Sequence, residues 1–198
     1  MIFEPSLAVP AQTVAVEQNE QFLYIGNFSQ TAAHKAFDIL LKAWSLFHQL
    51  RPRPRLLLLG GGDATPWQGF AQQLDCGDSI EFTGYQTNIV PFLAQSCCLL
   101  LPSRKEGISN ALLEAQSWGI PAIVSDIPGN RAVVEQEKNG LLVPVGDSKA
   151  LAEALLHLYD APLLRKEYGR AARTRIENIF ALEKVADQTV ALYQQLAA

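Results

Sequence analysis

Two glutamates and a lysine carry the chemistry that this sequence suggests most directly. Glu106 and Glu114 lie eight positions apart in the stretch PSRKEGISNALLE, and Gly107 follows the first of them. An ionised carboxylate only accepts hydrogen bonds, so it suits the recognition of hydroxyl groups. Lys35, much earlier in the chain, offers a positive charge for a phosphate. These residue types indicate a site for a ligand with both hydroxyls and phosphates, such as a sugar carried on a diphosphate.

The loop that contains Glu106 joins an expected strand to an expected helix. Residues 97–101 are apolar throughout, as in a buried strand, and residues 110–118 have a helical pattern that Gly119 ends. The first turn of a helix leaves backbone N–H groups unpaired, and its dipole attracts anions. Gly107 lets a ligand approach the backbone closely. The loop therefore predicts an anion site at the tip of the helix.

Strand and helix patterns alternate along the chain. The expected strands are residues 21–26, 55–59, 79–83, 97–101, 120–125 and 141–145. The expected helices are residues 35–50, 65–74, 87–95 and 110–118, and helix then continues almost to the end with breaks near 160–162 and 178. Apolar strands between helices predict a parallel sheet covered on both faces. The fold class is α/β: a three-layer α/β/α Rossmann-like domain with a six-stranded parallel sheet, for which the usual order is 3-2-1-4-5-6.

This strand order brings two distant loops together. Ligands of doubly wound sheets bind beyond the carboxyl ends of the strands where the order reverses, here between the first and fourth strands. Residues 27–34 follow the first strand and lead to Lys35, whereas residues 102–109 follow the fourth and contain Glu106. We therefore expect Lys35, Glu106 and the helix tip to line one crevice.

A structural role for the two glutamates is the alternative. Acidic residues are favoured near the start of a helix whether or not a site is present. The position of Glu106, directly after an abrupt strand end and before Gly107, favours the functional interpretation.

Composition limits the class of protein. A length of 198 residues, 48% of them hydrophobic, fits a single domain over residues 1–198, with an N-terminal extension at 1–19 and a C-terminal helix at 181–198. The net charge of −4 offers no basic surface for nucleic acid. The apolar runs are too short to span a bilayer, and the N-terminus does not resemble a secretory signal.

The cysteines and histidines indicate neither a disulfide framework nor a metal site. Cys97 and Cys98 are adjacent within an expected strand, and Cys76 makes the count odd, so we interpret them as buried thiols. This favours a cytoplasmic location. No Asp-x-Asp pair or histidine cluster suggests a metal, so no metal or other cofactor is expected.

The segment LPSRKEGISNALLEAQSWGIPAIVSDIPGN resembles the donor-binding signature of the family-four, or group 1, glycosyltransferases. These are retaining enzymes of the GT-B architecture, marked by a glutamate, a glycine and a second glutamate with seven residues between the acids. The stretches NGLLVP and GDSKALAEAL are also similar to the family. The resemblance runs from about residue 21 to the C-terminus and implies the C-terminal, donor-binding half of a GT-B fold.

The resemblance also implies roles for individual residues. Glu106 would be catalytic and contact the donor sugar, and Glu114 would bind the ribose hydroxyls. The other implied donor-binding residues are Gly26, Asn27, Lys35, Gly84, Tyr85, Gly107, Ile108, Ser109 and Asn110. Among them, Lys35 would bind phosphate, and Gly84 and Tyr85 would border the base.

The chain departs from the family pattern at two positions. Asn27 occupies the place of an arginine that commonly helps to hold the diphosphate, and Ala36 replaces the glycine that usually follows the lysine. Loss of a guanidinium weakens stabilisation of the leaving diphosphate. Arg104 is a candidate replacement for that charge.

The resemblance implies a hexosyltransferase of carbohydrate biosynthesis that uses a nucleoside-diphosphate sugar as donor. Its partner would be an N-terminal acceptor domain, in cis or in trans. Any peripheral membrane association would run through that domain. Without that domain the chain should transfer sugar poorly, because catalysis depends on positioning both reactants. Three alternatives stay open: the non-catalytic half of a split enzyme, a GT-B nucleotide-sugar epimerase-like domain, and a sugar-phosphate-binding domain without catalysis.

Overall fold

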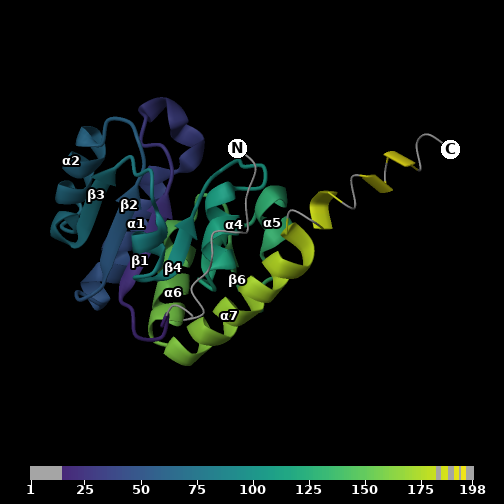
Figure 1. The fold of residues 1–198 in the computed structure, drawn as a ribbon. Helices are drawn as coiled ribbons and strands as arrows, with labels where there is room; N and C mark the ends of the chain where they lie inside the picture. Colours follow the sequence, from purple (N-terminus) through teal and green to yellow (C-terminus); the bar gives the residue numbers. More distant parts are fainter. Residues whose placement is uncertain (1–14, 182–183, 187–189, 192, 195–198) are drawn as a thin grey trace.

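The computed structural model describes residues 15–181, 184–186, 190–191 and 193–194 (Figure 1). Within these ranges the strands form one six-stranded sheet in the order β3-β2-β1-β4-β5-β6, and every pair in it is parallel. The predicted doubly wound order is confirmed. Much of the expected C-terminal helix and most of the N-terminal extension lie outside the described residues.

The elements agree closely with the predicted alternation. The strands are β1 (Gln21–Ile25), β2 (Arg55–Leu59), β3 (Ile80–Gly84), β4 (Ser96–Leu101), β5 (Ala122–Ser125) and β6 (Gly140–Val143). The α-helices are α1 (Phe37–Leu50), α2 (Thr65–Gln73), α3 (Val90–Leu93), α4 (Asn110–Ser117), α5 (Pro128–Val133), α6 (Ser148–Tyr159) and α7 (Pro162–Arg175). Three shorter helices are η1 (Gln30–Lys35), η2 (Gly77–Ser79) and η3 (Ile176–Phe180).

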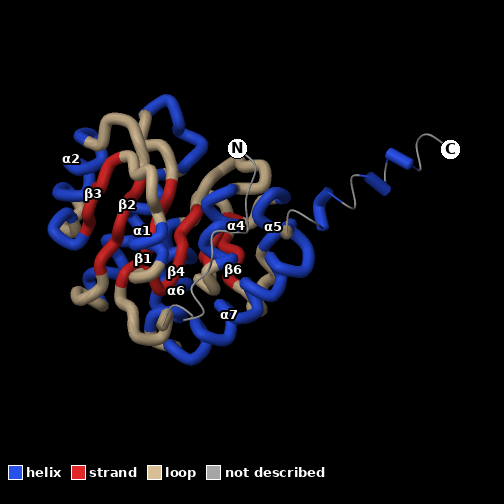
Figure 2. Tube along the Cα trace, viewed as in Figure 1, coloured by secondary structure: helices blue, strands red, loops and turns tan. Residues whose placement is uncertain are grey.

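Helices cover both faces of the sheet, as Figure 2 shows. Helix α1 packs against α2 and α6, while α4 packs against α7. The central strand β4 is buried at all six positions because it has strands on both sides and helices above and below. Its Cys97 and Cys98 are free and fully buried, and burial raises the pKa of Cys97 to about 12. The interpretation of these residues as buried thiols is confirmed.

Some helix boundaries differ from the prediction. The helix expected over residues 87–95 is only the four-residue α3, whose first turn contains Pro91. Helix α5 was not expected as a helix and also begins at a proline, Pro128, which suits a first turn because no N–H is needed there. An interruption near Asn178 is present but takes another form: α7 ends at Arg175, the π-helical η3 contains Asn178, and the chain leaves the helical conformation at Ala181.

The end of the N-terminal extension packs onto α7. Val16 is buried, and its carbonyl accepts a hydrogen bond of 3.0 Å from the guanidinium of the buried Arg165. Glu17 forms an ion pair of 2.5 Å with Lys166. These contacts hold residues 16 and 17 against the same helix.

Candidate functional site

The loops after β1 and β4 meet at the carboxyl edge of the sheet, the upper edge in Figure 1. The backbone N–H of Arg104 donates a 2.7 Å hydrogen bond to the carbonyl of His34. Next to this contact, the Lys35 Nζ forms an ion pair with the Glu106 Oε1. The predicted convergence of the two loops is confirmed, across 71 positions of sequence.

The Lys35–Glu106 pair is sheltered from solvent. The side chains of Lys35 and Glu106 are 19% and 14% exposed. The same oxygen, Oε1 of Glu106, accepts a 3.0 Å hydrogen bond from the Ser103 hydroxyl. Sequence reasoning did not assign Ser103 a role, although it lies in the Pro-Ser pair that precedes the signature. Two donors therefore orient one carboxylate oxygen and leave Oε2 without a recorded partner among the described residues.

A strained backbone residue separates η1 from α1. Ala36 has φ 56° and ψ 44°, the left-handed conformation, which is costly for a residue with a Cβ. A glycine adopts it without that cost, which gives a physical reason for the glycine common at this place in the family. Helix α1 therefore begins at Phe37, and Lys35 lies at the end of η1 rather than in the helix predicted over residues 35–50.

The start of α4 provides free donor groups. Ser109, the residue before α4, is extended and makes no side-chain capping bond. No described atom would lie within 4 Å of a Cβ on Gly107, so space is open beside the loop. Ile108 and Asn110 are exposed. The open loop and the uncapped first turn suit the binding of an anion.

Glu114 lies one turn into α4, at its fifth residue. Its side chain is partly buried, and burial raises the pKa of its carboxyl group. Neither carboxylate oxygen has a recorded hydrogen bond or ion pair with the described residues. An unpaired carboxylate in this position is available to accept hydrogen bonds from a ligand.

Gly129 supports the loop from the opposite side and was missed by sequence reasoning. A Cβ on Gly129 would lie 2.2 Å from the Gly107 carbonyl oxygen and 2.6 Å from that of Glu106. The start of α5 therefore packs directly against the Glu106–Gly107 backbone. The Ile-Pro-Gly sequence at the start of α5 was the available signal.

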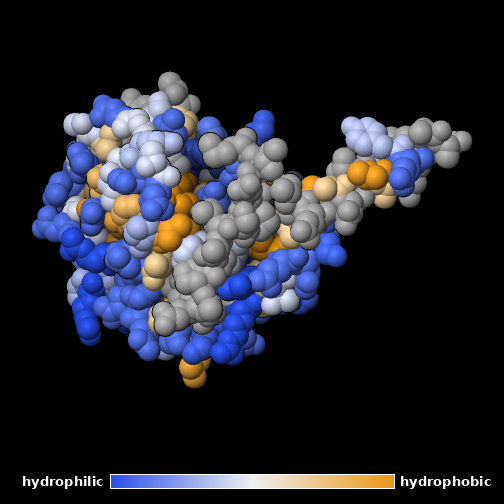
Figure 3. All heavy atoms as spheres, viewed as in Figure 1, coloured by the Kyte–Doolittle hydropathy of each residue, from blue (hydrophilic) through white to orange (hydrophobic). Residues whose placement is uncertain are grey.

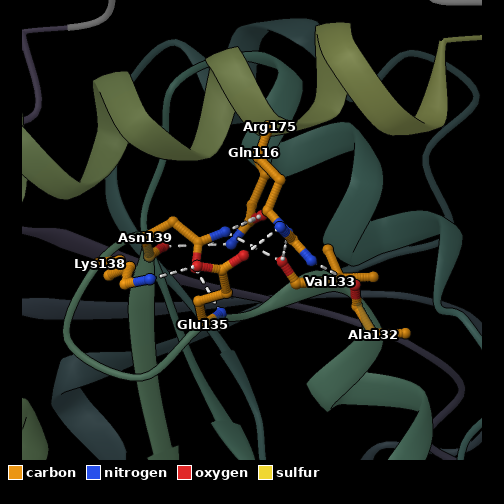
Figure 4. A network of polar contacts seen from close by, with 7 residues as sticks. All are labelled: Gln116, Ala132, Val133, Glu135, Lys138, Asn139 and Arg175. Carbon is orange, nitrogen blue, oxygen red and sulfur yellow. Dashed lines mark hydrogen bonds and ion pairs between the residues drawn. The ribbon is translucent and has the colours of Figure 1, made fainter.

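The other end of α5 is held by a polar network (Figure 4). Arg175 donates to the carbonyls of Ala132 and Val133, at 3.0 and 2.9 Å, and forms an ion pair with Glu135. The neighbouring Lys138 and this guanidinium lower the pKa of the Glu135 carboxyl group. Helix α7 thus fixes the helix that supports the Glu106 loop.

A pocket of about 340 Å³ lies on the β2–β3 side of the edge. Its lining includes Gly26, Asn27 and the 73%-exposed Tyr85. The glycines after β2 allow close packing there, since a Cβ on Gly60 would lie 1.6 Å from the Gly26 carbonyl oxygen. Gly84, with φ 70°, ends β3 beside the pocket.

Arg104, the candidate replacement for the missing arginine, is bound to another carboxylate in this structure. Its guanidinium donates to both carboxylate oxygens of Asp38, at 3.0 and 2.9 Å, and to the Ala33 carbonyl at 2.8 Å. Asn27 accepts a 2.7 Å hydrogen bond from the Ser29 N–H and so stabilises its own turn. Lys35 is therefore the cation that lies at the Glu106 carboxylate.

The comparison with known families decides the identity of this fold. A family model described as "Glycosyl transferases group 1" matches residues 19–161. The chain therefore belongs to the group 1 glycosyltransferases. It corresponds to the C-terminal domain of such an enzyme, with a Rossmann-like half of the GT-B fold.

This glycosyltransferase domain has curated relatives about twice its length or longer. It is 28% identical over 190 residues to an uncharacterized glycosyltransferase of Haemophilus influenzae, covering 94% of this chain and 52% of the relative. It is 36% identical over 148 residues to an Escherichia coli protein, UDP-Gal:alpha-D-GlcNAc-diphosphoundecaprenol alpha-1,3-galactosyltransferase, covering 74% of this chain and 38% of the relative. The chain therefore spans about half or less of these proteins.

A solved structure of the same architecture is sucrose-phosphate synthase from Thermosynechococcus elongatus. It superposes on the domain with a TM-score of 0.80 at 28% identity, covering 91% of this chain and 46% of that one. None of the helices in the described ranges is both long and apolar enough to cross a bilayer. The same ranges contain no group of three His, Cys, Asp or Glu residues arranged to hold a metal ion.

Proposed function

We propose that this domain binds the donor of a retaining hexosyltransferase, a nucleoside-diphosphate sugar, at the carboxyl edge of its sheet. The observation that carries the proposal is the contact of Lys35 with Glu106 beside the start of α4. It gathers a cation, a carboxylate and unpaired N–H groups within one site. This set matches the phosphates and hydroxyls of an activated sugar.

Each part of the donor has a complementary group in this proposal. The diphosphate lies at the backbone of residues 107–110 and takes the charge of Lys35. Glu106 accepts hydrogen bonds from the sugar through its free Oε2, and Glu114 accepts them from the ribose. The base enters the pocket beside Gly84 and Tyr85. The printed name of the Escherichia coli relative, which includes UDP-Gal, supports a nucleotide sugar as the ligand class.

The transfer itself requires an acceptor domain. Exposed apolar side chains follow three strands along the carboxyl edge: Tyr85 after β3 (73% exposed), Ile108 after β4 (50%) and Val145 after β6 (45%). On the face in Figure 3 the surface over α7 is mostly hydrophilic, although Leu163 of that helix is exposed, and apolar atoms gather nearer the middle of the molecule. We infer that an N-terminal domain, in cis or in trans, covers the apolar side chains of the edge and holds the acceptor.

Isothermal titration with UDP, GDP and ADP tests the proposal. We expect one of them to bind, and Glu114→Ala to weaken binding about tenfold or more through lost hydrogen bonds to a charged acceptor. Glu153→Ala, an exposed glutamate on α6, is the matched control and should leave the affinity unchanged. Absence of binding to all three nucleotides, or equal loss in both variants, would contradict the proposal.

A second candidate is binding without transfer, by a sugar-phosphate-binding domain without catalysis. The engagement of Arg104 by Asp38 and the asparagine at position 27 favour it, because they leave fewer cations near the diphosphate. The two candidates differ in one measurement. With an acceptor domain and acceptor present, release of nucleoside diphosphate from the bound donor identifies the transferase, and binding without release identifies the domain without catalysis.

A further inference from the structure

The side chain of Tyr24 extends from β1 toward the candidate site, although no sequence motif includes this residue. It lies on β1, its side chain is fully buried, and its ring meets Phe37 edge-on at 4.6 Å between centroids. A Cβ on Gly26 would lie 2.4 Å from the Tyr24 hydroxyl oxygen. Residues two apart on a strand share a face, so the Tyr24 ring runs along β1 to the carboxyl edge. Its hydroxyl occupies the place that a side chain at Gly26 would fill.

This hydroxyl has no hydrogen-bond partner among the described residues. A buried tyrosine normally gives its O–H a partner, because an unmade hydrogen bond is costly. Phenylalanine would fill the same volume without that cost. The unpaired Tyr24 hydroxyl therefore destabilises the folded free protein, and it does so at the sheet edge where the candidate site lies.

The carboxylate of Glu106 gives a reason for a tyrosine rather than a phenylalanine at position 24. Burial, together with the negative charge of Glu106, raises the pKa of Tyr24, so its hydroxyl stays protonated and remains a donor. Glu106 already accepts from Lys35 and Ser103 through Oε1. If Lys35 moves to a phosphate, a carboxylate that is 14% exposed loses its main partner and needs another donor.

We propose that Tyr24 is a positioning residue whose hydroxyl donates to Glu106 when Lys35 moves from Glu106 to a donor phosphate. The inference rests on the proposed function, because it requires a phosphate ligand at Lys35. The free protein keeps the Lys35–Glu106 pair and an unsatisfied hydroxyl. The bound protein exchanges the ion pair for a lysine–phosphate contact and a Tyr24–Glu106 hydrogen bond, which keeps Glu106 directed at the sugar.

The variant Tyr24→Phe tests this with two readouts of opposite sign. Thermal unfolding of the free protein should shift upward by about 2–4 °C, because an unsatisfied polar group is removed. Titration should show affinity for the best-binding nucleotide among UDP, GDP and ADP falling about three- to tenfold. The fall should be at least as large for that nucleotide's glucose conjugate. A purely structural hydroxyl would give lower thermal stability instead.

Tyr159→Phe is the matched control. The Tyr159 hydroxyl donates a 3.0 Å hydrogen bond to Glu20, so its removal should lower the unfolding temperature and leave nucleotide affinity unchanged. A double variant then tests whether Tyr24 affects nucleotide binding through Glu106. Tyr24→Phe should have little effect in a Glu106→Ala background if Tyr24 acts through Glu106.

The outcomes separate the two proposals. If the wild-type protein binds a nucleotide and Tyr24→Phe binds it equally well, the positioning role of Tyr24 is wrong and the proposed function stands. A Tyr24→Phe effect that persists in full in the Glu106→Ala background also overturns the role. If the wild-type protein binds none of the nucleotides or conjugates, the proposed function fails first.

Discussion

At the scale of single residues, the two glutamates of the signature have different surroundings. Glu106 is paired with Lys35 and bonded to Ser103, whereas the carboxylate of Glu114 has no recorded partner among the described residues. A carboxylate without partners is destabilised by burial. Under the proposed function, hydrogen bonds from a ligand would offset this cost at Glu114.

The pKa of Glu114 leads to a stability prediction. Burial raises the folded-state pKa of Glu114 above the ordinary value of 4.5, because it disfavours the ionised carboxylate. The contribution of the protonated Glu114 side chain to folding stability is therefore fully present below pH 4.5 and is lost as pH rises through the folded pKa. Glu114→Gln should therefore raise the unfolding temperature at pH 7, with a difference that shrinks toward pH 4. A variant less stable than wild type at pH 7 would contradict this. The exposed Glu153→Gln provides the baseline in the same thermal scans.

At the scale of elements, the Glu106 loop is held between two helices. Helix α4 begins after the loop, and Gly129 of α5 packs against the loop backbone. Arg175 of α7 donates hydrogen bonds to the other end of α5. Packing and hydrogen bonds from neighbouring helices hold a loop in a geometry that its own sequence does not fix. The geometry of the site thus depends on residues outside the signature.

Gly129→Ala tests the support from α5. The added methyl would meet the Gly107 carbonyl at 2.2 Å, and overpacking of this kind costs about 1–3 kcal/mol. We expect a lower unfolding temperature and weaker nucleotide binding, because the Glu106–Gly107 backbone must shift. Gly69→Ala is the control, since no atom of the described residues outside the helix's own backbone lies within 4 Å of its Cβ site in α2, and alanine favours a helix. Equal nucleotide affinities for Gly129→Ala and wild type would show that α5 does not position the loop.

At the scale of the whole molecule, ion pairs join segments that are distant in sequence. Glu17 binds Lys166 of α7, and Glu135 pairs with Arg175 of α7. Glu135 also pairs locally with Lys138, three residues along the chain. The hydrogen bond from Lys166 lowers the pKa of Glu17, and Lys138 together with Arg175 lowers that of Glu135. Both carboxylates stabilise the fold in their ionised form.

The whole domain should therefore lose stability in acid. Groups with lowered folded pKa values stabilise the protein above the ordinary pKa of 4.5, and this contribution is lost as pH falls through the folded values. Thermal scans between pH 7 and pH 3 should show the unfolding temperature falling mainly below about pH 4.5. Glu17→Gln should lower the unfolding temperature at pH 7 and make this fall shallower. An unchanged pH profile in Glu17→Gln would mean that the Glu17–Lys166 pair contributes nothing to the fold.

Much of this protein could be predicted from the sequence by itself. The alternation of apolar runs and helical patterns determined the α/β class and the strand order, because both depend on local periodicity and general rules of chain topology. The strand order in turn predicted that Lys35 and Glu106 would meet, across 71 positions. The signature around Glu106 pointed to the family that the chain belongs to.

Only the tertiary structure decided the contacts that complete the site. Three of these contacts depend on ångström-scale distances between segments that are far apart in the chain. They are the ion pair of Arg104 with Asp38, the close packing of Gly129 against the Gly107 carbonyl, and the lack of a partner for the Tyr24 hydroxyl among the described residues. Periodicity shows which face of an element is buried, but it does not show which atom lies opposite another. Packing of the whole chain sets those distances, and so decided which side chains are free to bind a ligand.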